Sequence, residues 1–164
     1  MDLRVRKKLP HTVPQWVAEG SWFFITIKCL PLGKNQLCQG DGAHGVTRPT
    51  VGEGVLAAMA HNHDKHVWHC GLGLLMPDHL HAILAFPREP GMQTVISNWK
   101  KYVAVKPGVK WQRDFFDHRL RNDQELQAKT NYILMNPVRK ELCEHAEDWT
   151  WVYRPGSRPP RQRG

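Results

Sequence analysis

Residues 66–86 have the sequence HVWHCGLGLLMPDHLHAILAF, and this stretch decides the fold. Apolar residues dominate both halves, and Pro77 followed by Asp78 at the centre is typical of a tight turn. Two runs of this kind around a turn predict two antiparallel strands. We therefore expect strands at 66–76 and 79–86, joined directly by that turn.

Further elements are predicted on both sides of this hairpin. Thr50 followed by Glu53 forms a capping box, which favours a helix directly after it. Pro137 is expected to end the last helix, because the residue before a proline disfavours helical geometry. The full prediction comprises strands at 21–30, 66–76, 79–86 and 110–119, and helices at 51–63, 92–105 and from Asn122 to about Asn136. The first six elements match a ferredoxin-like split βαβ arrangement of the α+β class. It has an antiparallel sheet with two helices on one face, and the other face is free for a ligand or for the last helix.

Composition sets limits on the class of protein. The 164 residues suit one domain, and 23 Lys and Arg against 15 Asp and Glu give a formal charge of +8. This balance favours a polyanionic partner. No apolar run approaches the ~18 residues of a membrane span, and the basic N-terminus lacks the apolar stretch of a secretory signal. We therefore expect a cytoplasmic protein without membrane contact, whose four cysteines are free thiols.

Two histidines of the third predicted strand are candidate metal ligands. His79 and His81 are two residues apart, so both imidazoles point to one face of the sheet. Two imidazoles about 7 Å apart along a strand can ligate one divalent cation. The alternative is a pair of partly exposed sheet histidines that contact phosphate. A second group is better explained as a polar helix end followed by a strand; its members are His61, His63, His66 and His69.

The last predicted helix carries a candidate nucleophile. Tyr132 and Asn136 are four residues apart and lie on one helix face, with Lys129 on the same side. A purely structural alternative makes Tyr132 a tyrosine at the edge of the core and Asn136 a residue of the helix end. The functional hypothesis is that the Tyr132 oxygen attacks a DNA phosphate beside a divalent cation and leaves a phosphotyrosine and a free 3′-hydroxyl. The rival nucleophiles Tyr102 and Tyr153 have no Asn or Gln four residues later.

Three segments, in order along the chain, resemble a known family. They are LMPDHLH at 75–81, WQRDFFDH with LRN at 111–122, and NYILMNPVR at 131–139. Together they resemble the HUH single-tyrosine transposases, and most closely the REP-associated tyrosine transposases. The resemblance implies Mg²⁺- or Mn²⁺-dependent nicking and rejoining of single-stranded DNA near hairpins through a 5′-phosphotyrosine.

The resemblance also implies residue roles and boundaries. His79 and His81 become metal ligands, Asn136 assists at the metal, and Tyr132 is the nucleophile. Three parts are expected: a basic arm at 1–14, a catalytic domain at 15–153 whose additional C-terminal helix carries the nucleophile, and a basic, disordered tail at 154–164. The chain departs from the family pattern in a glycine-rich insertion at 31–49 and in Lys140-Glu141.

The expected partner is single-stranded DNA with hairpins, bound by a monomer or a homodimer. The candidate DNA-binding residues are Lys100, Lys101, Arg119, Arg121, Lys129 and Arg139. Two other functions stay open at this point. One is a non-catalytic nucleic-acid-binding module on the same fold. The other is a two-histidine phosphoesterase, although the paired H-x-[ST] motifs of that class do not occur.

Overall fold

The computed structural model of the chain describes residues 20–39 and 50–156. The predicted arm at 1–14, most of the insertion at 31–49 and most of the tail at 154–164 lie outside the described residues. The elements are β1 (Trp22–Lys28), α1 (Val51–Asp64), β2 (His69–Met76), β3 (His79–Ala85), α2 (Met92–Val105), β4 (Phe116–Arg119), α3 (Asp123–Arg139), the 3₁₀ turn η1 (Ala146–Asp148) and β5 (Val152–Tyr153).

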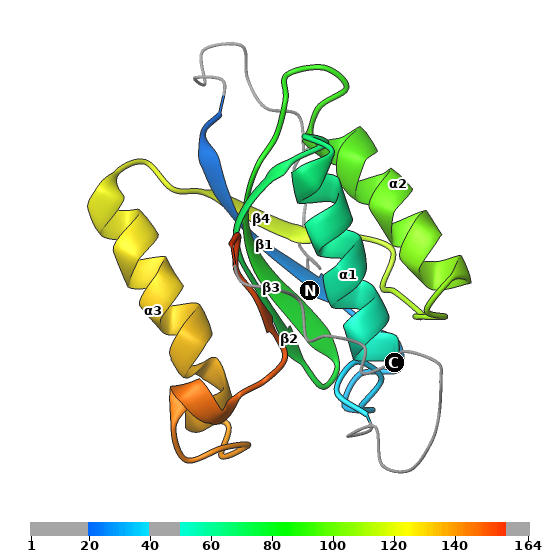
Figure 1. Cartoon of the computed structure of the whole chain (residues 1–164), viewed down its shortest axis with the longest axis vertical. Coiled ribbons are helices and arrows are strands. Elements are labelled where there is room, and N and C mark those ends of the chain that lie inside the picture. The colour runs from blue at the N-terminus through cyan, green and yellow to red at the C-terminus, as the bar shows by residue number, and fades with distance from the viewer. Residues whose placement is uncertain (1–19, 40–49, 157–164) are drawn as a thin grey trace, which may run out of the picture.

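A five-stranded antiparallel sheet forms the centre of the fold, in the order β4-β1-β3-β2-β5 (Figure 1). The first four strands have the order of the predicted split βαβ arrangement, and the hairpin between β2 and β3 turns at Pro77-Asp78 as predicted. Sequence analysis missed β5, which pairs Val152 and Tyr153 with β2. A strand of two residues is too short to show an alternating pattern.

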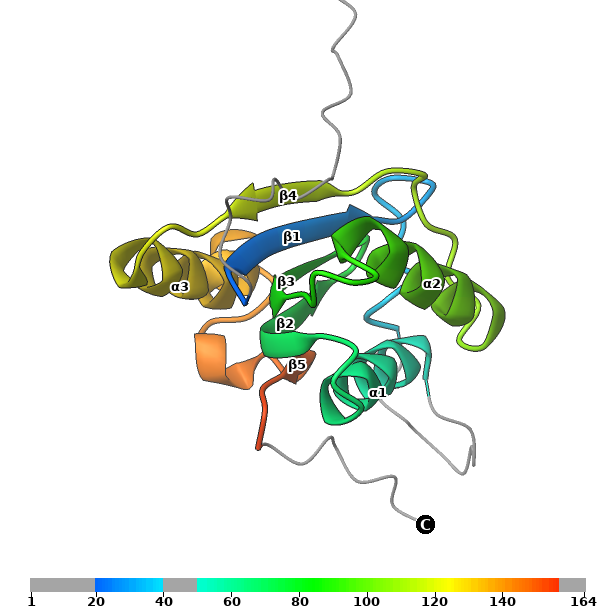
Figure 2. The ribbon, with the colours of Figure 1, turned by 90° about the horizontal axis from the view of Figure 1, so that it is seen from above.

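The sheet has a different partner on each face. Helices α1 and α2 cover one face, and α3 covers the other (Figure 2). Ile25, Leu80 and Leu84 point to the first face and are fully or almost fully buried beneath the two helices. The capping box predicted for α1 is present, since the Thr50 side chain accepts from the Glu53 amide and Glu53 accepts from the Thr50 amide.

The second face packs against α3 through a smaller core. Its buried residues are Phe24, Leu72, Leu74, Met76, Ile83, Leu120 and Ile133. Only Ile133 of this group belongs to α3, and it is completely buried. Asn122 caps the helix as predicted, with its side chain accepting from the Glu125 amide. This attachment fixes α3 across the face that also carries His79 and His81.

Two predicted boundaries are wrong. Helix α3 continues through Pro137 to Arg139, and its last turn is closed by the Lys140 amide, which donates to the Asn136 carbonyl although Pro137 has no N–H to donate. The strand predicted at 110–119 is regular only over β4, and Trp111 adds an isolated bridge to Cys29. Between these points the carbonyls of Gln112 and Arg113 accept from the Lys100 ammonium, so they bond to α2 and not to a strand.

Within residues 20–39 and 50–156, no helix combines the length and the hydropathy that crossing a bilayer requires.

The packing of α3 predicts a large difference between two neighbouring aliphatic side chains. Ile133→Ala empties a fully buried site and should lower the free energy of unfolding by about 2–5 kcal/mol. Met135→Ala on the same helix removes a 42% exposed side chain and should cost less than about 1 kcal/mol. Urea unfolding followed by circular dichroism measures both. Equal losses would show that α3 is not held by the Ile133 contact.

Candidate functional site

The two imidazoles lie on the α3 face of β3. His81 is opposite Thr26 of β1 and His79 is opposite Lys28, in the antiparallel register of the two strands. The intervening Leu80 is buried on the opposite face. His81 is buried, with 6% of its surface exposed, and His79 is half-buried. The alternation expected from the sequence is therefore realised.

The ring nitrogens of the two histidines converge. The distance between His79 Nε2 and His81 Nε2 is 3.2 Å. Two nitrogens each about 2.1 Å from one cation, at about 90–109° to each other, would be about 3.0–3.4 Å apart. The pair therefore has the spacing of two adjacent ligands of a single divalent ion.

The outer nitrogens of both rings have hydrogen-bond partners. His79 Nδ1 donates to Asp78 Oδ1 at 2.7 Å, and His81 Nδ1 lies 2.9 Å from Thr26 Oγ1. Partners at Nδ1 are what hold metal-ligating histidines in one orientation. The second carboxylate oxygen of Asp78 accepts from the Gly33 amide at 2.8 Å.

The surroundings keep His81 neutral. Burial lowers the pKa of His81 to about 3, and nearby positive charges act in the same direction. These charges belong, in decreasing order of effect, to His79, Lys129, Arg139 and Lys28. Burial raises the pKa of Asp78, but hydrogen bonds from His79 and Gly33 outweigh it, so the net pKa is lowered and the carboxylate is ionised. The two Nε2 atoms are hydrogen-bonded to each other, and a cation that binds both would displace the proton between them.

Tyr132 of α3 lies beside the histidine pair. Its ring centroid is 6.2 Å from that of His81 and 6.3 Å from that of Phe24, which stacks on His81. Two cations lie against the phenol ring: Lys129 Nζ at 5.0 Å and Arg139 Cζ at 4.4 Å from the centroid. The side chain is 45% exposed, so the phenol is accessible to a ligand.

Asn136, the residue predicted to assist at the metal, lies one turn after Tyr132 and is buried, with 4% of its surface exposed. Among the hydrogen bonds of the described residues, none joins its amide to either imidazole. The structure thus brings His79, His81 and Tyr132 together, and it buries Asn136 on the same helix as Tyr132, four residues further on.

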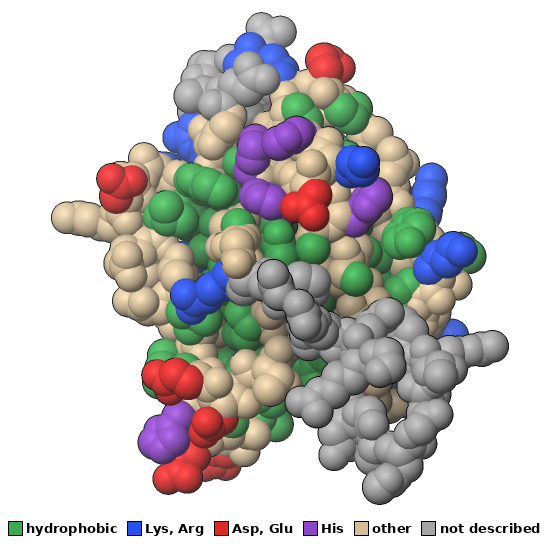
Figure 3. Space-filling view, viewed as in Figure 1, with side chains coloured by type: hydrophobic (Ala, Val, Ile, Leu, Met, Phe, Trp, Pro, Cys, Tyr) green, Lys and Arg blue, Asp and Glu red, His purple; other side chains and the backbone are tan. Residues whose placement is uncertain are grey.

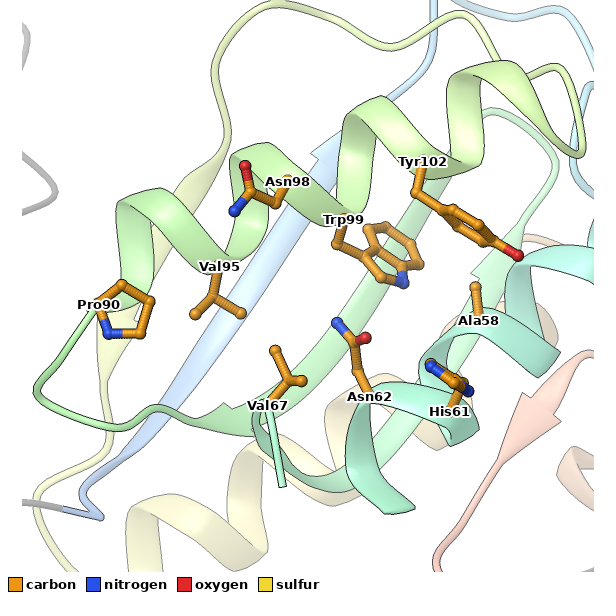
Figure 4. Close-up of a pocket in the computed structure, with 9 residues that line it drawn as sticks. All are labelled: Ala58, His61, Asn62, Val67, Pro90, Val95, Asn98, Trp99 and Tyr102. Atoms are coloured by element: carbon orange, nitrogen blue, oxygen red, sulfur yellow. The ribbon is translucent and has the colours of Figure 1, made fainter. Parts of the chain in front are cut away.

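The rival tyrosines lie elsewhere. Tyr102 is on α2, on the opposite face of the sheet, beside a cavity of about 310 Å³ between α1 and α2 (Figure 4). Tyr153 of β5 is buried, and burial raises its pKa, with the charges of Cys70 and Asp64 adding to the effect. Neither ring makes a ring contact with His79 or His81 among the described residues.

Comparison with known proteins identifies relatives. A REP-associated tyrosine transposase of Escherichia coli (strain K12) is 31% identical over 81 residues, which cover 46% of this chain and 48% of the relative. A predicted REP-associated tyrosine transposase of Haemophilus influenzae is 24% identical over 94 residues, which cover 47% of this chain and 53% of that protein. The chain is a homologue of the REP-associated tyrosine transposases. Each match spans about half the length of the relative. No family model matches the chain.

The comparison of structures points to the same class of proteins. The structure of a REP-associated tyrosine transposase bound to a REP hairpin matches with a TM-score of 0.65 and 19% identity, over 85% of this chain and 80% of the other. The α+β architecture of this homologue is therefore that of a REP-associated tyrosine transposase.

The basic residues predicted to bind DNA lie in three places. Lys129 and Arg139 contact the Tyr132 ring, Arg119 and Arg121 lie where β4 leads into α3, and Lys100 and Lys101 lie on α2 at the other face of the sheet. The Lys100 ammonium donates to the carbonyls of Gln112 and Arg113 at 2.7 and 2.9 Å. That cation is therefore already used to hold the segment before β4.

The second histidine group is on the surface where α1 ends and β2 begins (Figure 3). His63 and His66 each have a ring centroid 6.0 Å from that of His69, and His63 Nδ1 accepts from the Cys70 amide. In the described part of the chain, no group of three or more His, Cys, Asp or Glu side chains is arranged to hold a metal. As predicted, these histidines lie at a helix end and the start of the following strand: two on the last turn of α1, one in the connection and His69 at the first position of β2.

Sequence reasoning missed three residues of the site. Phe24 and Thr26 belong to β1 and meet His81 only through the register of two strands that are 55 residues apart. No local pattern reveals that register. Asp78 had a signal, since it directly precedes His79 in a tight turn, but it was interpreted only as a turn residue.

The buried neutral imidazole predicts a pH dependence of stability in the metal-free protein. Below pH 6.5 the unfolded chain protonates His81, whereas the folded chain does not do so until about pH 3. The unfolded state then binds more protons, so the free energy of unfolding falls as pH falls, by at most about 1.4 kcal/mol per pH unit. Urea unfolding in chelator from neutral to acid pH measures this slope.

The matched variants are His81→Gln and the exposed His145→Gln. The slope should become shallower in the first and stay unchanged in the second. Parallel curves for wild type and His81→Gln would contradict the assignment of this proton to His81.

Proposed function

We propose that this chain is a metal-dependent transposase or endonuclease that nicks and rejoins single-stranded DNA near hairpins through a 5′-phosphotyrosine. One observation carries the proposal: the exposed Tyr132 phenol lies beside two imidazoles whose Nε2 atoms are 3.2 Å apart. The homology to REP-associated tyrosine transposases and the REP hairpin bound by the structural relative suggest the same class of DNA substrate.

Tyr132 is the proposed nucleophile. Its phenol oxygen forms a bond to the scissile phosphorus while the bond from phosphorus to the 3′ oxygen breaks. The phenol gives up its proton, the leaving 3′ oxygen gains one, and the 5′ phosphate stays on Tyr132. Attack by a 3′-hydroxyl on this phosphotyrosine reverses the exchange, so the strand is rejoined without an external energy source.

His79 and His81 are the proposed metal ligands, with Asn136 completing the shell. A bound Mg²⁺ or Mn²⁺ would neutralise charge on the scissile phosphate. The hydrogen bonds of Asp78 and Thr26 hold the two rings so that both Nε2 atoms face one point. An imidazole pair fits Mn²⁺ well, and an amide oxygen and water would supply the remaining ligands.

Positive side chains around Tyr132 support binding of the DNA backbone. Lys129 and Arg139 lie against the phenol ring, and Arg139 also donates to the Tyr132 carbonyl at 2.6 Å. Together with Arg119 and Arg121 they would pair with phosphates of the strand that approaches the site. Lys100 and Lys101 would contact DNA only where it reaches the α2 side. We infer a cytoplasmic role on DNA, as a monomer or a homodimer.

The nucleophile is tested by substitution. Tyr132→Phe should reduce formation of a covalent protein–DNA adduct by at least about a thousandfold, because the attacking oxygen is removed. The assay incubates hairpin DNA carrying unpaired flanks with the chain and Mn²⁺, followed by denaturing electrophoresis. Tyr102→Phe should keep the wild-type rate. An adduct that persists in Tyr132→Phe would overturn the assignment, and tight DNA binding without any adduct would favour the non-catalytic module.

The metal ligands are tested through the Mn²⁺ dependence of that adduct. His79→Ala should raise the half-saturating Mn²⁺ concentration by at least about tenfold, and Thr26→Val by about tenfold through loss of the His81 partner. His145→Ala serves as the control, since it is exposed and on another element. An unchanged Mn²⁺ requirement in His79→Ala would show that this pair does not hold the ion.

A further inference from the structure

A groove of about 470 Å³ opens on one side of His79. Its walls come from the end of β1, the segment after it, the β2–β3 turn and the segment after α3. The residues that matter for its chemistry are Lys28, Leu32, Asp78, His79, Lys140 and Leu142. His79 is thus shared between the groove and the proposed metal site.

The walls of the groove are fixed by hydrogen bonds that backbone amides donate. Gly33 donates to the Asp78 carboxylate at 2.8 Å, which holds the segment that carries Leu32. After α3, the Lys140 amide donates to the Asn136 carbonyl and the Leu142 amide donates to the Pro137 carbonyl. Because these contacts do not use the side chains, the lysines and leucines are left to meet a ligand.

The groove combines positive charge with exposed apolar surface. Lys28 and Lys140 are both exposed, while Leu32 and Leu142 are 59% and 43% exposed. The one acid of the lining named above, Asp78, already accepts from His79 and Gly33. A ligand that suits this lining has an anionic part and a flat or apolar part, as an unpaired nucleotide has in its phosphate and its base.

We propose that this groove binds the unpaired nucleotide next to the scissile phosphate, with Lys28 and Lys140 on its phosphate and Leu32 and Leu142 on its base or sugar. The inference rests on the proposed function, because it takes the scissile phosphate to lie at the histidine pair. Lys28 is the register partner of His79, so a phosphate held there is one strand away from the proposed metal ligands. The groove thereby positions the strand for attack by Tyr132.

Two hairpins test the proposal, one with an unpaired flank and one without. Binding of the full chain is measured by fluorescence anisotropy in chelator, over about 50–200 mM salt. Lys28→Ala and Lys140→Ala should each weaken binding of the flanked hairpin by about three- to tenfold and make the salt slope shallower by about 0.7, the value for one phosphate of a single strand. Neither should change binding of the hairpin without a flank.

Further variants separate the two kinds of contact. Lys65→Ala, an exposed lysine at the end of α1, should leave both affinities unchanged. Leu142→Ala should weaken binding of the flanked hairpin but leave the salt slope as in wild type, because no charge is removed. If Leu142→Ala has no effect while the lysine variants do, the groove binds phosphate alone and the nucleotide assignment is wrong.

Failure of the groove and failure of the proposed function give different results. Lysine variants that bind both hairpins like wild type, while the Tyr132-dependent adduct forms, would overturn the groove and leave the function standing. A flank-dependent loss in the lysine variants without any adduct in the wild type would overturn the phosphotyrosine mechanism and keep the groove as a DNA-binding site.

Discussion

The pairing of β3 with β1 and β2 is the constraint on which the rest of the structure depends. Because β3 is central, its alternate side chains must face two different layers. Leu80, Ala82 and Leu84 enter the core beneath α1 and α2, whereas His79 and His81 face α3. A shift of one residue in this pairing would bury both imidazoles beneath α1 and α2 and move the leucines to the face covered by α3. The hydrophobic core and the proposed metal site are therefore fixed by the same register.

Helix α3 contributes the second half of the site and is attached to the sheet through a small apolar core. Ile133 is the α3 side chain that enters the small core completely, Leu126 and Leu134 pack partly against it, and the other buried residues of the helix are Asn136 and Pro137. Tyr132, adjacent to that anchor, is surrounded by His81, Phe24 and two cations. The phenol ring of Tyr132 therefore stays open to solvent on one side. The backbone carbonyl of Tyr132 accepts a hydrogen bond from the Arg139 side chain. The position of the Tyr132 ring is thus set by its contacts with His81 and Phe24, and the position of its backbone by the hydrogen bond from Arg139.

Much of the fold follows from local signals in the sequence. The cap at Thr50, the turn at Pro77 and the alternation after His79 lie where the structure has the corresponding features. What the sequence did not reveal depends on distant contacts: β5 is too short for a pattern, and Thr26 meets His81 across 55 residues. Helix α3 ends after Pro137 and not before it, because backbone hydrogen bonds beyond the proline close one more turn. The convergence of the two Nε2 atoms depends on the side-chain conformations of His79 and His81, which the sequence pattern does not specify.

The Asp78 carboxylate joins the segment after β1 to the imidazole of His79, and it does so through the Gly33 peptide group alone. Side chains around Gly33 take no part in that link. The amino acids of this segment can therefore change during evolution while the orientation of the imidazole is preserved. Under the proposed function, the preference for a DNA target and the chemistry of cleavage could then diversify at separate rates, provided that the Gly33 amide keeps its place.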